Sequence, residues 1–268
     1  MLTRIIKQNL DFYLFLIIIA IFLTPYIAEC SGVGTSGNTM LKIGVGAKAT
    51  SMGEAIIAET NDITSIYWNP AGLVRVRKSE FSAMHVEWFD DIRYEWIGFA
   101  QPLSRRVTIG ADVSYLYMGS ITRTIESITE EYEQDGTFTP VDIAGRIALS
   151  FEVLNGLLVG ASMQRIQSQV NFEKITKSRI NDKTAQGMAI DVGCIYNLPK
   201  IKGLSLGTCF QNFGGQSKGF ITKKESMPFS MNIGMAYKMQ MKTEKKQEKT
   251  PESEIQTEQK TDERKISG

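Results

Sequence analysis

The chain has 268 residues, and its 30 basic and 29 acidic residues give a formal net charge of +1 at pH 7. This balance creates no field that would attract nucleic acid, so we expect no nucleic-acid partner. A hydrophobic content of 43% and a mean hydropathy of −0.12 are too low for a helical membrane protein. They suit a β-barrel, whose strands alternate between lipid-facing and lumen-facing residues.

The first 30 residues are organised like a secretory signal peptide, with a basic region, an apolar run and a small-residue stretch. These parts are Arg4 and Lys7, Phe12 to Leu23, and the residues around Ala28. We therefore expect residues 1–30 to direct export. An uncleaved membrane anchor is the alternative, because the apolar run, when it is extended to Ala28, approaches the ~20 residues that span a bilayer. Lipidation of Cys30 is a minority interpretation, since Glu29 is a poor residue before a lipoprotein cysteine.

Residues 31–78 are rich in small residues and contain two motifs with turn chemistry. Ser51-Met52-Gly53-Glu54 fits a capping box, which predicts a short helix over residues 55–58. In Asn69-Pro70-Ala71-Gly72, the asparagine can cap a turn, the proline fits its first position, and the glycine can end it with a positive φ. This region is therefore predicted to form compact helical turns rather than a strand.

Residues 79–240 repeat an alternation of apolar and polar positions that is typical of β-strands. From Val107 to Tyr117 every odd position is apolar, and residues 141–153 and 229–239 follow the same period of two. Runs of this length exceed the ~5–6 residues of most soluble strands and match the ~9–11 of tilted transmembrane strands. The pattern predicts about eight strands. The remaining five are 80–88, 93–102, 157–169, 185–198 and 204–213.

The expected fold is all-β, an antiparallel transmembrane β-barrel. Connections are short at 103–105, 154–156 and 199–203, and long at 119–138, 170–184 and 214–227. Such alternation is typical of barrels with tight periplasmic turns and long outer loops, although the link at 89–92 is short where a long one is expected. A soluble exported β-sandwich remains the alternative, because its strands alternate in the same way.

Few residues in the chain suggest chemistry. His85 is the only histidine and has no identifiable partner, whereas catalytic triads and multi-histidine zinc sites require one. The acids Asp90, Asp91 and Glu130 to Glu133 fall in predicted loops, and adjacent acids alone do not supply the roughly 6–8 converging oxygens that calcium needs. We expect no enzyme activity, catalytic residue, cofactor or metal site.

Polar residues on the predicted strands are candidates for a lumen face. They are Asp112, Arg146 and Glu152. Cys194 and Cys209 lie on neighbouring predicted strands at opposite pleat parities, which argues against a disulfide. Residues 241–268 consist mainly of Lys, Glu, Gln, Thr and Ser without apolar periodicity. This tail is expected to be disordered and, from the phase of the connections, periplasmic.

Five segments resemble the opening of PorV-type outer-membrane proteins, which belong with FadL-type long-chain fatty-acid transporters and an uncharacterised outer-membrane group related to both. These segments are Leu41–Ala49, Ser51–Ala55, Ile66–Leu73, His85–Trp88 and Glu95–Ala100, and the dipeptide Asn61-Asp62 is a sixth matching segment. The resemblance implies that residues 43–73, with Ser51 to Glu54 and Asn69 to Gly72, form an amino-terminal hatch. In these families the hatch plugs a barrel of fourteen strands.

The resemblance further implies that the chain resides in the outer membrane and contacts its lipid. Two functions follow as expectations: passage of hydrophobic small molecules across that membrane, or an accessory role in protein secretion or surface attachment. The partners would be a hydrophobic ligand in the first case and secretion-machinery proteins in the second.

The chain departs from the family pattern in its number of strands. A closed barrel of eight strands has room only for its own side chains, so a hatch of this length would not fit inside. The chain is therefore expected to be truncated, to receive strands from a partner, or to remain an open barrel. Truncation is favoured, because an open edge in lipid leaves unpaired backbone groups that cost several kcal/mol each.

Overall fold

The computed structural model describes residues 38–126, 132–173, 184–218 and 224–239. The predicted signal peptide, Cys30 and the polar tail lie outside these ranges. No helix in the described ranges is long and apolar enough to cross a membrane.

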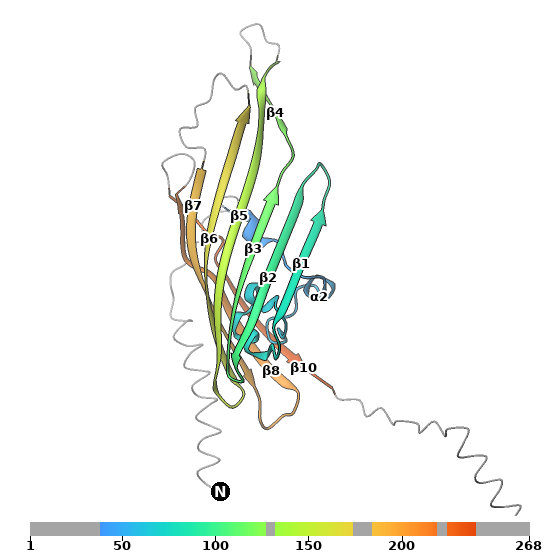
Figure 1. Cartoon of the computed structure of the whole chain (residues 1–268), viewed down its shortest axis with the longest axis vertical. Coiled ribbons are helices and arrows are strands. Elements are labelled where there is room, and N and C mark those ends of the chain that lie inside the picture. Colours follow the sequence, from blue (N-terminus) through green and yellow to red (C-terminus); the bar gives the residue numbers. More distant parts are fainter. Residues whose placement is uncertain (1–37, 127–131, 174–183, 219–223, 240–268) are drawn as a thin grey trace, which may run out of the picture. The chain divides into compact units, whose positions relative to one another are not determined.

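Ten strands of the described residues form one antiparallel sheet (Figure 1). They are β1 (Glu80–Glu87), β2 (Arg93–Ser104), β3 (Val107–Tyr117), β4 (Ile121–Glu126), β5 (Tyr132–Leu154), β6 (Leu157–Glu173), β7 (Thr184–Asn197), β8 (Leu204–Lys218), β9 (Lys224–Ser226) and β10 (Ser230–Tyr237). The strand order is β1-β2-β3-β5-β6-β7-β8-β10, with β4 beside β5 and β9 beside β8. All eight predicted strands are present, which confirms the all-β antiparallel fold.

Three predicted loops are in part strands, so these predictions were wrong. β6 continues to Glu173, into the loop predicted at 170–184, and the other two loops are 119–138 and 214–227. Much of 119–138 forms the pairing of β4 with the first part of β5, and 214–227 contains the end of β8 and all of β9. The β-branched and aromatic residues of these stretches, such as Ile121, Thr122 and Phe138, favour extended backbone even though the stretches are polar overall. Polarity alone was therefore a poor indicator of a loop.

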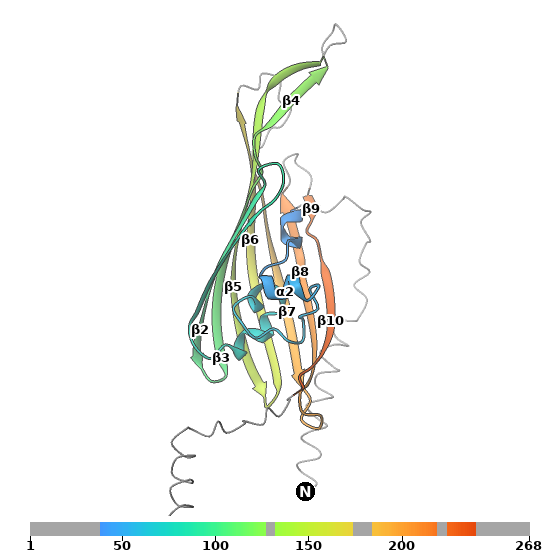
Figure 2. The same ribbon diagram turned by 90° about the vertical axis from the view of Figure 1, so that its right-hand side faces the viewer.

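Four short helical elements precede the sheet and lie on its concave side (Figure 2). They are η1 (Thr39–Lys42), α2 (Ala47–Ser51), α3 (Ser65–Trp68) and η2 (Pro70–Arg75). We call residues 38–78 the hatch. It folds partly on itself, because the Trp68 indole donates to the Val45 carbonyl at 2.7 Å and the Tyr67 hydroxyl donates to the Leu41 carbonyl at 3.0 Å.

The capping box predicted at Ser51 is absent. Ser51 ends α2, and its hydroxyl donates to the Lys48 carbonyl at 2.8 Å. Gly53 and Glu54 both have positive φ, at 60° and 65°, and residues 55–58 form turns instead of a helix. Two consecutive left-handed residues reverse the chain, so this segment terminates a helix rather than starting one.

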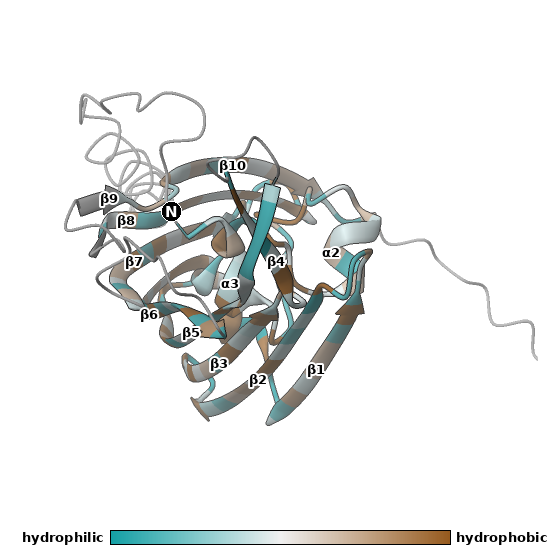
Figure 3. Cartoon of the chain, turned by 90° about the horizontal axis from the view of Figure 1, so that it is seen from above, coloured by the Kyte–Doolittle hydropathy of each residue, from teal (hydrophilic) through white to brown (hydrophobic). Residues whose placement is uncertain are grey.

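The apolar and polar faces of the sheet are reversed relative to those of a sheet in a soluble protein, because the polar side chains face inward and the apolar ones outward. Along β3, Thr108, Asp112 and Ser114 are buried against the hatch, whereas Ile109 and Val113 point outward and are 40% and 49% exposed. The other long strands repeat this arrangement, and apolar and polar residues alternate along them (Figure 3). The concave face is therefore rich in buried polar groups, and the convex face in exposed apolar ones.

The wall is open. β1 and β10 stand at the two ends of the strand path, and among the described residues they do not pair with each other. Seen from above, the sheet curves around the hatch, and α2 lies at the gap between β1 and β10 (Figure 3). The described strands form one curved sheet and not the two packed sheets of a sandwich.

Candidate functional site: the contact between hatch and wall

Asn69 joins two parts of the hatch to the wall. Its side-chain oxygen accepts the Ala71 amide at 3.1 Å, which confirms the predicted cap, and Pro70 occupies the first position of η2. Its amide nitrogen donates to the Ile57 carbonyl at 2.9 Å and to the Thr208 carbonyl of β8 at 3.3 Å. The side chain is fully buried, so these partners replace the water that it would otherwise bind.

Gly72 does not end the turn as predicted, because η2 continues to Arg75 and Gly72 has no positive φ. Its small size is required for another reason. A Cβ atom at this position would lie 2.0 Å from the hydroxyl oxygen of Thr60, so only glycine fits.

Small residues of the wall allow the hatch backbone to approach closely. Ser150, Gly160 and Gly193 lie opposite one another on β5, β6 and β7, and we call them the platform. A Cβ atom on Gly160 would lie 2.3 Å from the carbonyl carbon of Pro70, and one on Gly193 would lie 1.9 Å from the side-chain oxygen of Asn69. The Ser150 hydroxyl donates to the Ala71 carbonyl at 3.0 Å. The Asn69–Ala71 segment is thus seated directly on the wall.

Sequence analysis did not predict the platform. The available signal was the presence of isolated glycines at inward positions of otherwise regular strands, which often marks a close approach by another backbone. The identity of that backbone could not be read from the strands themselves.

Replacing Gly160 with alanine is expected to displace the Asn69–Ala71 segment, because the added Cβ would meet hatch backbone rather than a flexible side chain. Overpacking of this kind costs about 1–3 kcal/mol. Cys209 measures this displacement, because it is buried beneath the hatch. In a background with Cys30 and Cys194 changed to serine, a water-soluble maleimide should label Cys209 faster in the Gly160→Ala variant than in the parent.

Gly145→Ala is the matched control, because Gly145 is an exposed strand glycine with open space around its Cβ position. Its Cys209 labelling rate is expected to equal that of the parent. Equal rates in the Gly160 and Gly145 variants would contradict close seating of the hatch.

A second prediction concerns Asn69. Asn69→Ala removes the cap and leaves buried carbonyls without donors, so it is expected to lower the free energy of unfolding by about 1–3 kcal/mol. Asn61→Ala is the control, because the half-buried Asn61 amide bonds the Lys48 and Glu59 side chains within the hatch, and its loss should lower the free energy of unfolding by less than that of Asn69. Urea unfolding in detergent micelles measures both, and equal values would show that Asn69 does not hold the hatch.

A buried charge cluster lies on the wall beneath α3. We define it as Asp112 of β3, Arg146 of β5, Gln164 of β6 and Asp191 of β7. The Arg146 guanidinium lies 3.5 Å from a carboxylate oxygen of each aspartate, and it donates to the Gln164 side-chain oxygen at 2.9 Å. Arg146 is 7% exposed and both aspartates are 5% exposed or less, so water contributes little to their solvation. The single cation is therefore shared by two buried anions.

The charge cluster also binds the hatch. Arg146 donates to the Ile66 carbonyl at 3.3 Å, and its guanidinium carbon lies 5.2 Å from the centre of the Tyr67 ring. Such a contact adds cation–π attraction in a site with little water. Burial raises the pKa of the Tyr67 phenol, so this group stays neutral and keeps donating to the Leu41 carbonyl.

Asp191 has a further role within the wall. The pairing of β7 with β8 shifts register on both sides of Ile190, and Asn212 of β8 has a φ of 58°. At this irregularity the Asp191 carboxylate accepts the Asn212 backbone amide at 2.8 Å and the Ser162 hydroxyl at 2.6 Å. The side chain therefore substitutes for strand-to-strand pairing. Sequence analysis missed Asp191, although its inward position on β7 follows the same alternation as Asp112.

The structure separates the predicted lumen residues. Asp112 and Arg146 lie opposite each other in the pairing of β3 with β5 and face the hatch. Glu152 lies near the end of β5, where its side chain accepts the amide of Gly156 in the following turn at 3.1 Å, and it is not part of the charge cluster. The motif Ser51 to Glu54 is exposed at the gap, whereas Asn69 to Gly72 are buried on the wall.

Two other sequence-based interpretations are settled by geometry. His85 was expected to have no partner, but its ring Nδ1 lies 2.6 Å from a Glu95 carboxylate oxygen, because the two residues are opposite on β1 and β2. Both side chains are exposed. Cys194 and Cys209 are free and buried, which confirms the absence of a disulfide between them. Within the described ranges, no group of three or more potential protein ligands is arranged to hold a metal ion.

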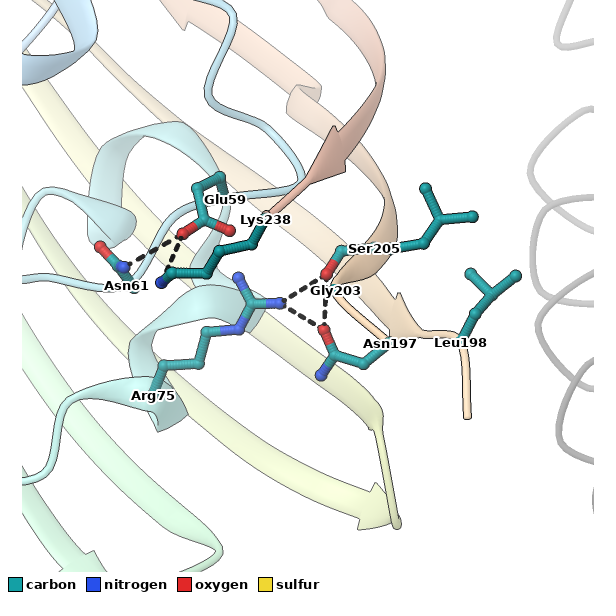
Figure 4. Close-up of a pocket in the computed structure, with 9 residues that line it drawn as sticks. Glu59, Asn61, Arg75, Asn197, Leu198, Gly203, Ser205 and Lys238 are labelled. Carbon is teal, nitrogen blue, oxygen red and sulfur yellow. Dashed lines mark hydrogen bonds and ion pairs between the residues drawn. The ribbon is translucent and has the colours of Figure 1, made fainter. Parts of the chain in front are cut away.

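The end of the hatch is fixed to the rim of the wall by Arg75. Its guanidinium donates to the carbonyls of Ala58 and Thr60 at 3.0 and 3.1 Å. It also donates to the Asn197 side-chain oxygen at 2.6 Å (Figure 4). Burial lowers the pKa of Arg75. A cleft of about 440 Å³ adjoins this contact, and Lys238 lies across it, 3.4 Å from Glu59.

These features define a class of protein: an all-β wall with an apolar exterior and a polar interior that carries an amino-terminal hatch. Residues 28–197 match the uncharacterised protein family UPF0164. Since the match covers more than half of the chain, the protein belongs to this family. Among solved structures the chain is similar to the P. putida toluene transporter TodX, with a TM-score of 0.49 and 12% identity over 73% of this chain and 67% of that one. No curated protein matches it.

Proposed function

We propose that the protein resides in the outer membrane, where its wall and hatch form part of a passage for hydrophobic small molecules. The observation that carries this proposal is the polarity of the sheet. Large apolar side chains occupy the convex face, including Phe99, Val113, Ile147 and Leu149, at 40–59% exposure. Exposed apolar patches of this extent are rare on soluble monomers and are what a lipid-facing wall requires.

The interior supports a passage that the hatch controls. The hatch contributes about half of the buried apolar residues and packs them against apolar residues of the wall, and polar contacts of Asn69, the charge cluster and Arg75 also hold it there. Moving the hatch therefore uncovers apolar side chains on both the hatch and the wall, and a hydrophobic ligand that covers these surfaces stabilises the displaced hatch. The FadL-type resemblance of the hatch sequence supports the same ligand class.

Two measurements on the full chain test the proposal. Alkaline carbonate extraction is expected to leave the protein in the membrane fraction, whereas release into the supernatant would favour the soluble exported alternative. Proteoliposomes are expected to take up labelled fatty acid faster than protein-free vesicles. Uptake no faster than in protein-free vesicles would contradict transport.

A PorV-like accessory role in secretion or surface attachment is the second candidate. The observation that favours it is the exposure of residues 51–55, because the segment that resembles PorV-type proteins is accessible instead of buried. Affinity capture from outer membranes should then recover secretion or surface-attachment proteins, and Met52→Asp should abolish the capture. Recovery of the protein alone would contradict this role.

A further inference from the structure

Within the part of the chain that the structure describes, the edge strands β1 and β10 each form backbone hydrogen bonds on one side only. Each residue of β1 pairs with β2, from Glu80 opposite Ala100 to Glu87 opposite Arg93, and each residue of β10 pairs with β8. Among the described residues, nothing pairs with the outer side of either strand. If the wall lies in lipid, as proposed above, each unpaired backbone group on these edges costs several kcal/mol. The edges therefore require a partner.

The surface exposed in the gap shows what kind of space lies there. Most exposed hatch residues at the gap are polar, including Lys48, Thr50, Ser51 and Glu54, and Met52 is the large apolar residue exposed among them. Figure 3 shows α2 lying between the ends of β1 and β10. Charged side chains are costly to place in the hydrocarbon of a bilayer. This face of the hatch therefore belongs to the interior of a barrel that is larger than the described sheet.

Strand direction restricts how the enclosure closes. Neighbours along the eight-strand path are all antiparallel, so β1 and β10 run in opposite directions. The β10 edge of one copy can therefore pair in an antiparallel manner with the β1 edge of another, when the two copies are related by a twofold axis along the barrel. The same axis pairs the two remaining edges, and no edge is left open. Twofold symmetry is the most common arrangement of homo-oligomers.

We propose that a second copy of this chain closes the wall, with β1 of each copy paired to β10 of the other. Two eight-strand paths give sixteen strands, an even number that keeps all neighbours antiparallel. Phe81 on β1 and Ile233 and Met235 on β10, at 67–73% exposure, then join one continuous apolar exterior. The exposed hatch faces of the two copies meet inside, and each carries both Lys48 and Glu54, so they do not repel as like charges.

Single-cysteine variants test this pairing in a background with all three native cysteines changed to serine. Ala83→Cys on β1 is co-expressed in membranes with Ile233→Cys or Met235→Cys on β10, each partner carrying a different tag, and the membranes are oxidised. A cross-linked product that carries both tags is expected at one of the β10 positions. Its mass should be the sum of the masses of the two tagged chains as they run separately after reduction. Ala111→Cys, exposed in the middle of the sheet on β3, is the control and should not cross-link.

The remaining outcomes separate this inference from the proposed function. A protein that resists carbonate extraction but stays monomeric and uncross-linked overturns the second-copy closure alone. A cross-link within one chain in the Ala83→Cys, Met235→Cys double variant also overturns it, as does a product of different mass that contains another protein. Release of the parent protein by carbonate overturns both the closure and the membrane assignment.

Discussion

Replacement of Arg146 by methionine is expected to lower the free energy of unfolding by about 3–5 kcal/mol, the cost of breaking a buried ion pair by removing one partner. Arg146 is the single cation between Asp112 and Asp191, and neither aspartate is more than 5% exposed. Without Arg146, the two buried carboxylates repel each other, and little water is present to solvate them. The hatch also loses the bond to the Ile66 carbonyl and the contact with Tyr67.

Urea unfolding in detergent micelles, followed by tryptophan fluorescence, measures this loss. Arg106→Met is the matched control, because Arg106 is exposed in the turn between β2 and β3, outside the convex face of the wall, and its guanidinium donates to the Asn155 side-chain oxygen at 3.4 Å. Its effect is expected to stay within about 0.5 kcal/mol. Adding Asp112→Asn to Arg146→Met should recover part of the loss, since it removes one uncompensated charge. A loss below about 1 kcal/mol for Arg146→Met would show that the cluster does not hold the fold.

Replacement of Ile147 by lysine is expected to abolish stable membrane assembly. Ile147 lies near the middle of the part of β5 that pairs with β3, on the convex face, and is 59% exposed. A lysine at the lipid-facing midplane of a barrel costs about 2–4 kcal/mol, and this falls to about 0–1 kcal/mol near the interfaces. The fraction of protein that resists carbonate extraction should therefore fall sharply.

The matched control is Ile201→Lys, at a similarly exposed apolar residue in the turn between β7 and β8. This turn lies beyond the strand ends, so the charge remains in water and extraction should match the parent. If Ile147→Lys and Ile201→Lys behave alike, the convex face is not in contact with lipid, and the proposed function loses its main support.

The sequence by itself determined the strands and the Asn69 cap. The strand predicted at 107–117 coincides with β3, and the cap of Asn69 on Ala71 is formed as expected. Both depend on local geometry: side chains alternate across a strand regardless of its neighbours, and a cap involves only residues two or three positions apart. The same local reasoning failed at Ser51, because the positive φ of Gly53 and Glu54 reverses the chain after α2.

Only the tertiary structure decided which residues meet. Asp112 faces Arg146 because β3 pairs with β5, although β4 lies between them in the sequence. Asp191 of β7 lies against the same guanidinium. The need for glycine at the platform positions 160 and 193 is explained only by the hatch segment that packs against them. The register between strands and the closure of the sheet depend on contacts between residues that are distant in the chain. The alternation of apolar and polar residues does not determine the register, because every register that places the polar face inward has the same alternation.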